Sequence, residues 1–154
     1  MKKITLSLRE RLMWQVALTV PFGVGLWIWG LAQAPTILLA LAGLFVLHEP
    51  LHVAGYALAG RRAQLTLLRG GLPTIAVRVI EPLPVGRYRV GLLAPAAWML
   101  ATCFVGLSLG QNGWVIAGLG GLASTSSDLA LAWKTRSVQG IVQDHPTDLG
   151  PLTG

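Results

Sequence analysis

The chain has 154 residues, of which 53% are hydrophobic and only 12% are charged. A soluble domain usually carries about 25% charged residues. With a mean hydropathy of +0.62, the composition therefore predicts an integral membrane protein, and the length predicts a single domain, residues 1–154. The lone cysteine, Cys103, excludes an internal disulfide. The net charge of +6 would, in a soluble chain, raise nucleic acid as a partner.

The basic residues are not spread evenly along the chain. They gather at residues 2–11, 61–89 and 134–136, and apolar segments separate these groups. If the chain crosses a bilayer four times, all three groups lie on one side. Loops rich in Lys and Arg stay in the cytoplasm, so both termini are expected there, most simply at a bacterial plasma membrane. The membrane topology thus accounts for the excess of basic residues, and no nucleic-acid partner is expected.

The fold class predicted is an all-α membrane protein with four transmembrane helices and a β-hairpin between the second and third. The apolar segments are each about the 20 residues that a span requires, and the first is too long for the apolar part of a signal peptide. Residues 1–11 form a basic arm, expected as a helix at the membrane surface. The four spans lie at about residues 12–32, 36–58, 90–109 and 114–133.

The segment between the second and third spans, residues 61–89, has a different pattern. Two runs with β-type residues, 64–68 and 74–80, flank a turn that contains Gly70-Gly71. Such runs around a glycine turn predict a β-hairpin, here on the cytoplasmic side. The tail, residues 134–154, is polar and has no clear periodicity, so it is expected as a cytoplasmic extension.

The second span contains the motif H-E-x-x-H at residues 48–52. On a helix, His48 and His52 project from one face about 6 Å apart, which is a spacing that chelates Zn²⁺. Glu49 is rotated by about 100° and can act as general base toward a water at the metal. Ionisable groups at this depth cost about 2.5 to 3.5 kcal/mol each, and a cation offsets that cost. The alternative is a chance match in which neighbouring hydroxyls satisfy the histidines.

A zinc hydrolase site needs three protein ligands and an open position, so a third ligand must lie elsewhere. Asp128 is the only acidic residue of the predicted spans outside the motif. It lies five residues before Trp133, whereas His52 lies six before Leu58, so the two depths match. Asp128 is therefore the predicted third ligand. Alternatively, it hydrogen-bonds Ser124 or another helix as a structural contact.

The tail carries one further group of interest, Asp144-His145-Pro146. Asp144 or His145 could replace Asp128 as third ligand, or could orient a ligating histidine through its second ring nitrogen. The same residues are also typical of an exposed turn. The sequence leaves these three alternatives open.

These motifs resemble a bacterial family of membrane zincin peptidases, and beyond it the site-2 protease type of intramembrane zinc metalloproteases. The resemblance covers about residues 45–150. It implies that His48, His52 and Asp128 bind zinc and that Glu49 is the catalytic acid and base. The residues that carry it are the H-E-x-x-H, Leu93-Ala94-Pro95, residues 127–131 around Asp128, and Asp144-His145-Pro146 with Gly150.

The chain also departs from the site-2 protease pattern. Those enzymes usually carry an Asn-x-x-Pro type element and a Leu-Asp-Gly around the third ligand. Here Ser127 and Leu129 flank Asp128, and the only asparagine is Asn112 in a predicted outer turn. Stabilisation of the transition state is therefore left to zinc, to backbone amides or to His145.

The predicted function is that of an intramembrane zinc metalloprotease. It would hydrolyse peptide bonds of a membrane protein or peptide substrate in the lipid bilayer, with Glu49 as general base. A metal-ion or proton transporter would also place His, Glu and Asp inside the membrane, but the first and third spans offer few polar residues for a pathway. An inactive chaperone or assembly module of the same fold is the other alternative.

Overall fold

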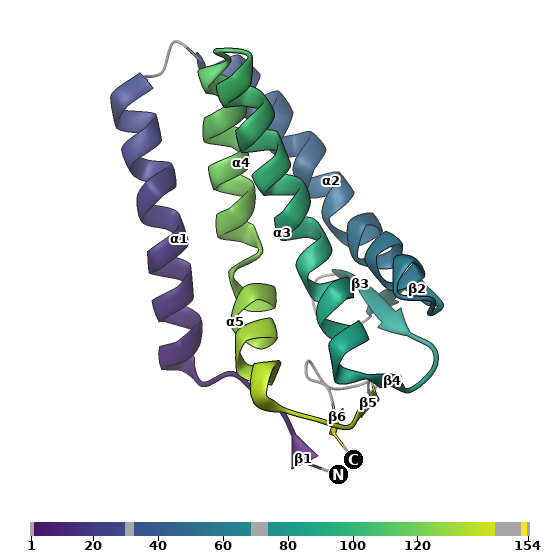
Figure 1. The fold of residues 1–154 in the computed structure, drawn as a ribbon. Helices are drawn as coiled ribbons and strands as arrows, with labels where there is room; N and C mark the ends of the chain where they lie inside the picture. Colours follow the sequence, from purple (N-terminus) through teal and green to yellow (C-terminus); the bar gives the residue numbers. More distant parts are fainter. Residues whose placement is uncertain (1, 30–32, 69–73, 144–151, 154) are drawn as a thin grey trace.

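The fold is described from a computed structural model, for residues 2–29, 33–68, 74–143 and 152–153. It is mostly helical, with two small sheets. The long helices run side by side, and the strands and both chain termini lie together at one end of them (Figure 1). Asp144 and His145 fall outside the described residues.

Three helices are long and apolar enough to cross a membrane: α1 (Leu8–Trp29), α2 (Ala34–Leu58) and α3 (Val85–Ser108). Two shorter helices, α4 (Asn112–Ser124) and α5 (Ser126–Lys134), meet at a bend of 54° when the short 3-10 turn Thr135–Ser137 is counted with α5. The described residues thus include three such helices, or four if the bent pair forms one span. The sequence predicts a single uninterrupted span over residues 114–133, and the structure divides it at Thr125.

Hydroxyl side chains at the division between α4 and α5 explain why the helix can bend there. The Ser124 hydroxyl donates to the Gly121 carbonyl at 2.6 Å, and the Thr125 hydroxyl donates to the Leu122 carbonyl at 2.9 Å. Ser and Thr hydroxyls that bond to carbonyls of the preceding turn compete with the backbone hydrogen bonds of the helix and often bend it. Thr125 is fully buried, and its backbone N–H also bonds to the Gly121 and Leu122 carbonyls at 3.3 and 3.1 Å. The bend gives α5 a direction of its own.

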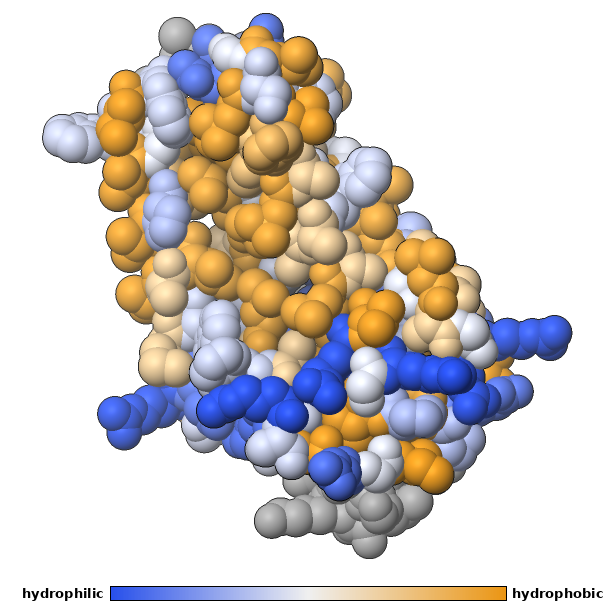
Figure 2. All heavy atoms as spheres, viewed as in Figure 1, coloured by the Kyte–Doolittle hydropathy of each residue, from blue (hydrophilic) through white to orange (hydrophobic). Residues whose placement is uncertain are grey.

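The outer surfaces of the helices are apolar, and the hydrophilic residues gather mainly at the end that carries the strands (Figure 2). Exposed residues on α1 and α2 include Trp27, Leu39 and Phe45, each more than three-quarters exposed. Apolar surface of this extent is stable against lipid but not against water. The side of the membrane on which the strand-bearing end lies stays a prediction.

Two of the strands, β2 (Ala63–Leu68) and β3 (Thr74–Val79), pair antiparallel, with Ala63 opposite Val79 and Thr66 opposite Ala76. They pack beside α2. They coincide with the two runs for which the sequence predicts a hairpin. The residues that would form its turn, 69–73, lie outside the described residues.

A second sheet pairs short strands that lie far apart in the sequence. Its order is β1 (Lys2–Lys3), β6 (Leu152–Thr153), β5 (Ile141–Gln143) and β4 (Leu83–Pro84), all antiparallel. The expected surface helix over residues 1–11 is wrong, because the helix begins only at Leu8. Strands of two or three residues have no detectable periodicity, so the pairing of the arm and the tail has no local signal.

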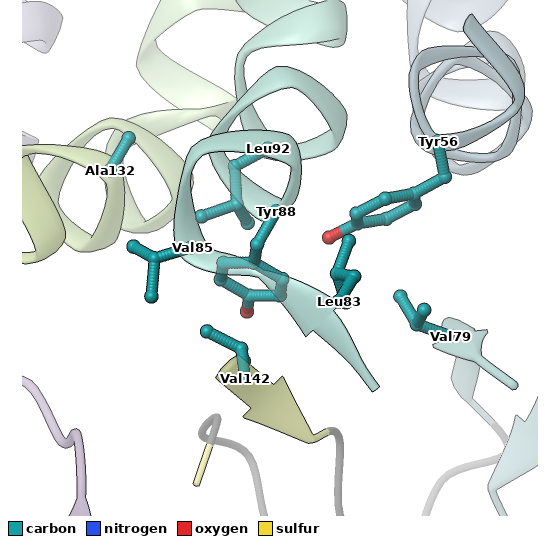
Figure 3. Packing of buried hydrophobic residues seen from close by; sticks show 8 residues of the cluster. All are labelled: Tyr56, Val79, Leu83, Val85, Tyr88, Leu92, Ala132 and Val142. Carbon is teal, nitrogen blue, oxygen red and sulfur yellow. The ribbon is translucent and has the colours of Figure 1, made fainter. Parts of the chain in front are cut away.

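The sheet is fastened to the helices by a cluster of buried side chains drawn in Figure 3. Leu83 and Val142, opposite each other in β4 and β5, are completely buried. The cluster joins the ends of α2, α3 and α5 to β3, β4 and β5, through Tyr56, Val79, Leu83, Val85, Tyr88, Leu92, Ala132 and Val142. Tyr56 lies one helical turn after His52, and Ala132 lies one turn after Asp128. The cluster therefore anchors α2 and α5 one turn away from His52 and Asp128.

Candidate metal centre

His48, His52 and Asp128 meet in the interior, although they come from two helices far apart in the chain. The Nε2 atoms of His48 and His52 each lie 3.4 Å from Oδ2 of Asp128. One ligand atom from each of the three residues lies within 4.8 Å of the others. The two imidazole rings stand edge to face, with centroids 5.0 Å apart. The depth match seen in the sequence thus corresponds to real proximity.

The two distances of 3.4 Å between histidine nitrogen and Asp128 oxygen suit ligands around a metal better than a hydrogen bond. An N–H···O bond is normally 2.7 to 3.2 Å long. Ligands bound to tetrahedral Zn²⁺ at about 2.0 to 2.2 Å are separated by about 3.3 to 3.6 Å, the edge of the tetrahedron. Two imidazole nitrogens and a carboxylate oxygen are also a common zinc donor set. The residues present therefore fit the metal.

His52 is oriented by a neighbouring helix. Its Nδ1–H donates to the carbonyl oxygen of Gly91 in α3 at 2.9 Å, and the residue is only 6% exposed. A histidine that donates from one ring nitrogen presents the lone pair of the other to a metal, so this bond leaves Nε2 free to face Asp128. α2 and α3 come close enough because Gly55 faces Gly91, where an added Cβ on Gly55 would lie 3.0 Å from the Gly91 Cα.

Sequence analysis missed Gly91 and Gly55. The signal that could have found them is the presence of small residues on both helices, which marks close approach of helices in membranes. It would have indicated that α2 and α3 touch near the motif. It would not have shown that a backbone carbonyl on α3 accepts the His52 proton, because that depends on the register between the two helices.

His48 has a different environment. Its side chain is 15% exposed, and its Nδ1 is buried with no hydrogen-bond partner among the described residues. Orienting a ligating histidine, without specifying which one, is one of the alternatives that the sequence leaves open for Asp144 or His145. That prediction falls outside the part of the chain described by the structure and stays open.

Asp128 and Glu49 occupy distinct positions around the two histidines. Asp128 belongs to α5 and faces the imidazoles. Ser124, the alternative hydrogen-bond partner considered for Asp128, donates its hydroxyl to the Gly121 carbonyl. Glu49 follows His48 on α2 and is partly exposed. It is not a member of the three-residue group, and its role as general base stays a prediction. α2 continues unbroken through Pro50.

The fold and the donor set define a class: a helical protein with membrane-spanning character and a three-residue group that fits zinc. The sequence model of the family described as "Putative zincin peptidase" matches residues 41–140, a stretch that includes both histidines, Glu49, the β2–β3 pair and Asp128. The chain belongs to this family, which supports metallopeptidase chemistry and implies zinc as the metal. Neither the curated proteins nor the solved structures contain a match to the chain.

Proposed function

We propose that this protein is an intramembrane zinc endopeptidase. The observation that carries the proposal is the convergence of His48, His52 and Asp128. Each histidine Nε2 lies 3.4 Å from Oδ2 of Asp128, one ligand atom from each residue lies within 4.8 Å of the others, and Glu49 directly follows His48 on the same helix. Three protein ligands leave the fourth position open for a water, as catalytic rather than structural zinc sites do.

The chemistry divides between the metal and the side chains. Bound zinc would supply Lewis acidity, which lowers the pKa of a water toward about 7. The Glu49 carboxylate takes the proton of the water whose oxygen adds to the scissile carbonyl carbon. It then delivers that proton to the amide nitrogen as the C–N bond breaks. His52, held by the Gly91 carbonyl, keeps its Nε2 aimed at the centre throughout.

The surroundings of the motif support cleavage within the bilayer. Phe45 and Val46, which lie three and two residues before the motif on α2, are 78% and 71% exposed. Such side chains belong in contact with lipid. The basic end of the helices would lie in the cytoplasm together with both termini, and the site would lie in the half of the membrane nearest to it.

The substrate class that fits is a membrane protein or peptide in an extended conformation, since a helix must unwind before its peptide bonds become accessible. The β2–β3 sheet packs beside α2 and has two strands within the part of the chain that the structure describes, so each strand has an outer edge there. An extended peptide can add to such an edge through backbone hydrogen bonds. We propose that the sheet presents the substrate to the site in this way.

A relation to the site-2 protease type is also proposed. The order of the parts agrees with it: an H-E-x-x-H helix, then two paired strands, then an aspartate on a later helix. The absence of an asparagine near the site remains the main departure in the sequence.

The deciding experiment compares the wild type with Glu49→Gln, both purified full length and reconstituted with a membrane-embedded reporter peptide. We expect one zinc per chain in both proteins and cleavage by the wild type alone. Full activity of Glu49→Gln would overturn the mechanism. Zinc flux across proteoliposomes without cleavage would favour a transporter, and a wild type without zinc would favour an inactive module.

A further inference from the structure

A hydrogen bond connects α1 to the start of the helix that carries Asp128. The hydroxyl of Ser126 donates to Oε1 of Gln15 at 2.6 Å. The amide nitrogen of Gln15 donates in turn to the hydroxyl of Thr19, one turn further along α1, at 3.2 Å. Ser126 is buried. Both hydrogen-bonding groups of the Gln15 amide are thus engaged, and its oxygen is directed toward α5.

The position of Ser126 on α5 relates it directly to the metal site. Ser126 is the first residue of α5, and Asp128 follows two residues later. Two residues correspond to about 200° of helical rotation, so the two side chains leave α5 on nearly opposite faces. Ser126 reaches back to α1 while Asp128 reaches forward to the histidines of α2.

α5 cannot set its own position. It has only nine residues and follows the bend at Thr125, and an isolated helix shorter than about 12 to 15 residues is marginal. Within the described residues it packs against α1 and α3, and it has little close backbone approach to α2. The separation between Asp128 and the two histidines therefore depends on how its other neighbours hold α5.

We propose that Gln15 is a positioning residue for the zinc site. Through Ser126 it fixes the rotation of α5 and hence the place of the Asp128 carboxylate. This inference rests on the metal centre of the proposed function and adds α1, which supplies no ligand, to the elements that build it. Loss of partners that orient ligands typically costs 10- to 100-fold in metal affinity.

Other contacts between α1 and α5 lie further from Asp128 and provide the control. The Lys134 ammonium donates to both carboxylate oxygens of Glu10 at 2.9 Å, and Trp14 packs edge to face against Trp133. They tie the same two helices together at the far end of α5. A general loosening of the helix pair would follow from breaking either, whereas the bond between Ser126 and Gln15 lies only two residues from Asp128.

The test uses the full-length protein and measures the zinc Kd by competition with a chromophoric chelator, together with the visible spectrum of the Co²⁺-substituted protein. The variants are Ser126→Ala, Gln15→Leu, the double variant, and Ser126→Thr, which keeps the hydroxyl. Lys134→Gln is the matched control. Thermal unfolding of the metal-free proteins reports stability separately.

We expect Ser126→Ala and Gln15→Leu each to raise the zinc Kd by roughly 10-fold and to weaken the absorption typical of four-coordinate Co²⁺. The double variant should be no worse than either single one, because both remove the same bond. Ser126→Thr should bind zinc like the wild type. Lys134→Gln should lower the unfolding temperature and leave the Kd unchanged.

Wild-type affinity in Ser126→Ala would overturn the inference, and so would an equal loss of affinity in Lys134→Gln. If Gln15→Leu does not fold, Ser126→Ala against Ser126→Thr decides. The proposed function fails separately: it falls if the wild type holds no zinc or if Glu49→Gln cleaves. A zinc-bound, active wild type with an unaffected Ser126→Ala protein would remove the role of Gln15 alone.

Discussion

The two helices that supply the candidate zinc ligands are built in opposite ways. α2 has 25 residues and is continuous, so the regular spacing of one helix sets His48 and His52 on one face. α5 has nine residues and begins after a bend, so Asp128 reaches the site only through packing against other helices. The relative placement of His48 and His52 is therefore set by local sequence spacing, whereas the placement of Asp128 depends on the tertiary fold.

The largest effect is expected from removing a ligand on either helix. His52→Ala and Asp128→Ala should both lose zinc and all peptidase activity, because two ligands do not hold the metal at a three-ligand site. Metal analysis of the purified proteins checks this. One zinc per chain in Asp128→Ala, with none in His52→Ala, would show that α2 binds the metal without α5. Asp128 would then not be a ligand, and the site would not depend on the placement of α5.

Glu49→Gln should have the next largest effect and should act on the reaction alone. The amide cannot accept the proton of the attacking water, so we expect a loss of about 10² to 10⁴-fold in cleavage rate. The zinc content should match that of the wild type. Rates measured on a reporter peptide in proteoliposomes test this prediction, and a loss of zinc in this variant would make Glu49 a ligand rather than a base.

The same contrast between local spacing and tertiary packing explains which features could be predicted from the sequence. The motif, the apolar helices and the two central strands follow from local periodicity. The depth of Asp128, counted from the end of its span, also placed it near His52, because helices that end at the same membrane surface share a scale of depth.

The parts that escaped sequence reasoning are non-local. The carbonyl of Gly91 meets His52 only in the observed register of α2 and α3, and Gln15 meets Ser126 across most of the chain length. The bend at Thr125 follows from hydroxyls whose bonds to carbonyls a sequence permits but does not dictate. The four-stranded sheet has strands too short to carry a pattern.

The packing of α4 against α3 can be tested with a pair of glycines. An added Cβ at Gly118 would lie 2.9 Å from the Met99 carbonyl oxygen, whereas at Gly23 on α1 it would meet nothing within 4 Å. We expect Gly118→Ala to lower the free energy of unfolding by about 1 to 3 kcal/mol. Gly23→Ala should be neutral or raise it by up to about 1 kcal/mol. Thermal unfolding in detergent measures both, and equal effects would contradict the observed packing.

The smallest effect is expected where α2 ends. Arg61 pairs with Glu81 at 3.0 Å, and both side chains are partly exposed, so Arg61→Gln should cost at most about 1 kcal/mol and less at high salt. A double-mutant cycle with Glu81→Gln isolates the pair. The zinc Kd should not change, because α2 holds its two histidines by its own backbone geometry and a disturbance beyond its last turn does not alter their spacing. Ser126→Ala, in contrast, perturbs a helix that is placed from outside. A rise of the zinc Kd in Arg61→Gln similar to that in Ser126→Ala would mean that α2 depends on its neighbours as much as α5 does.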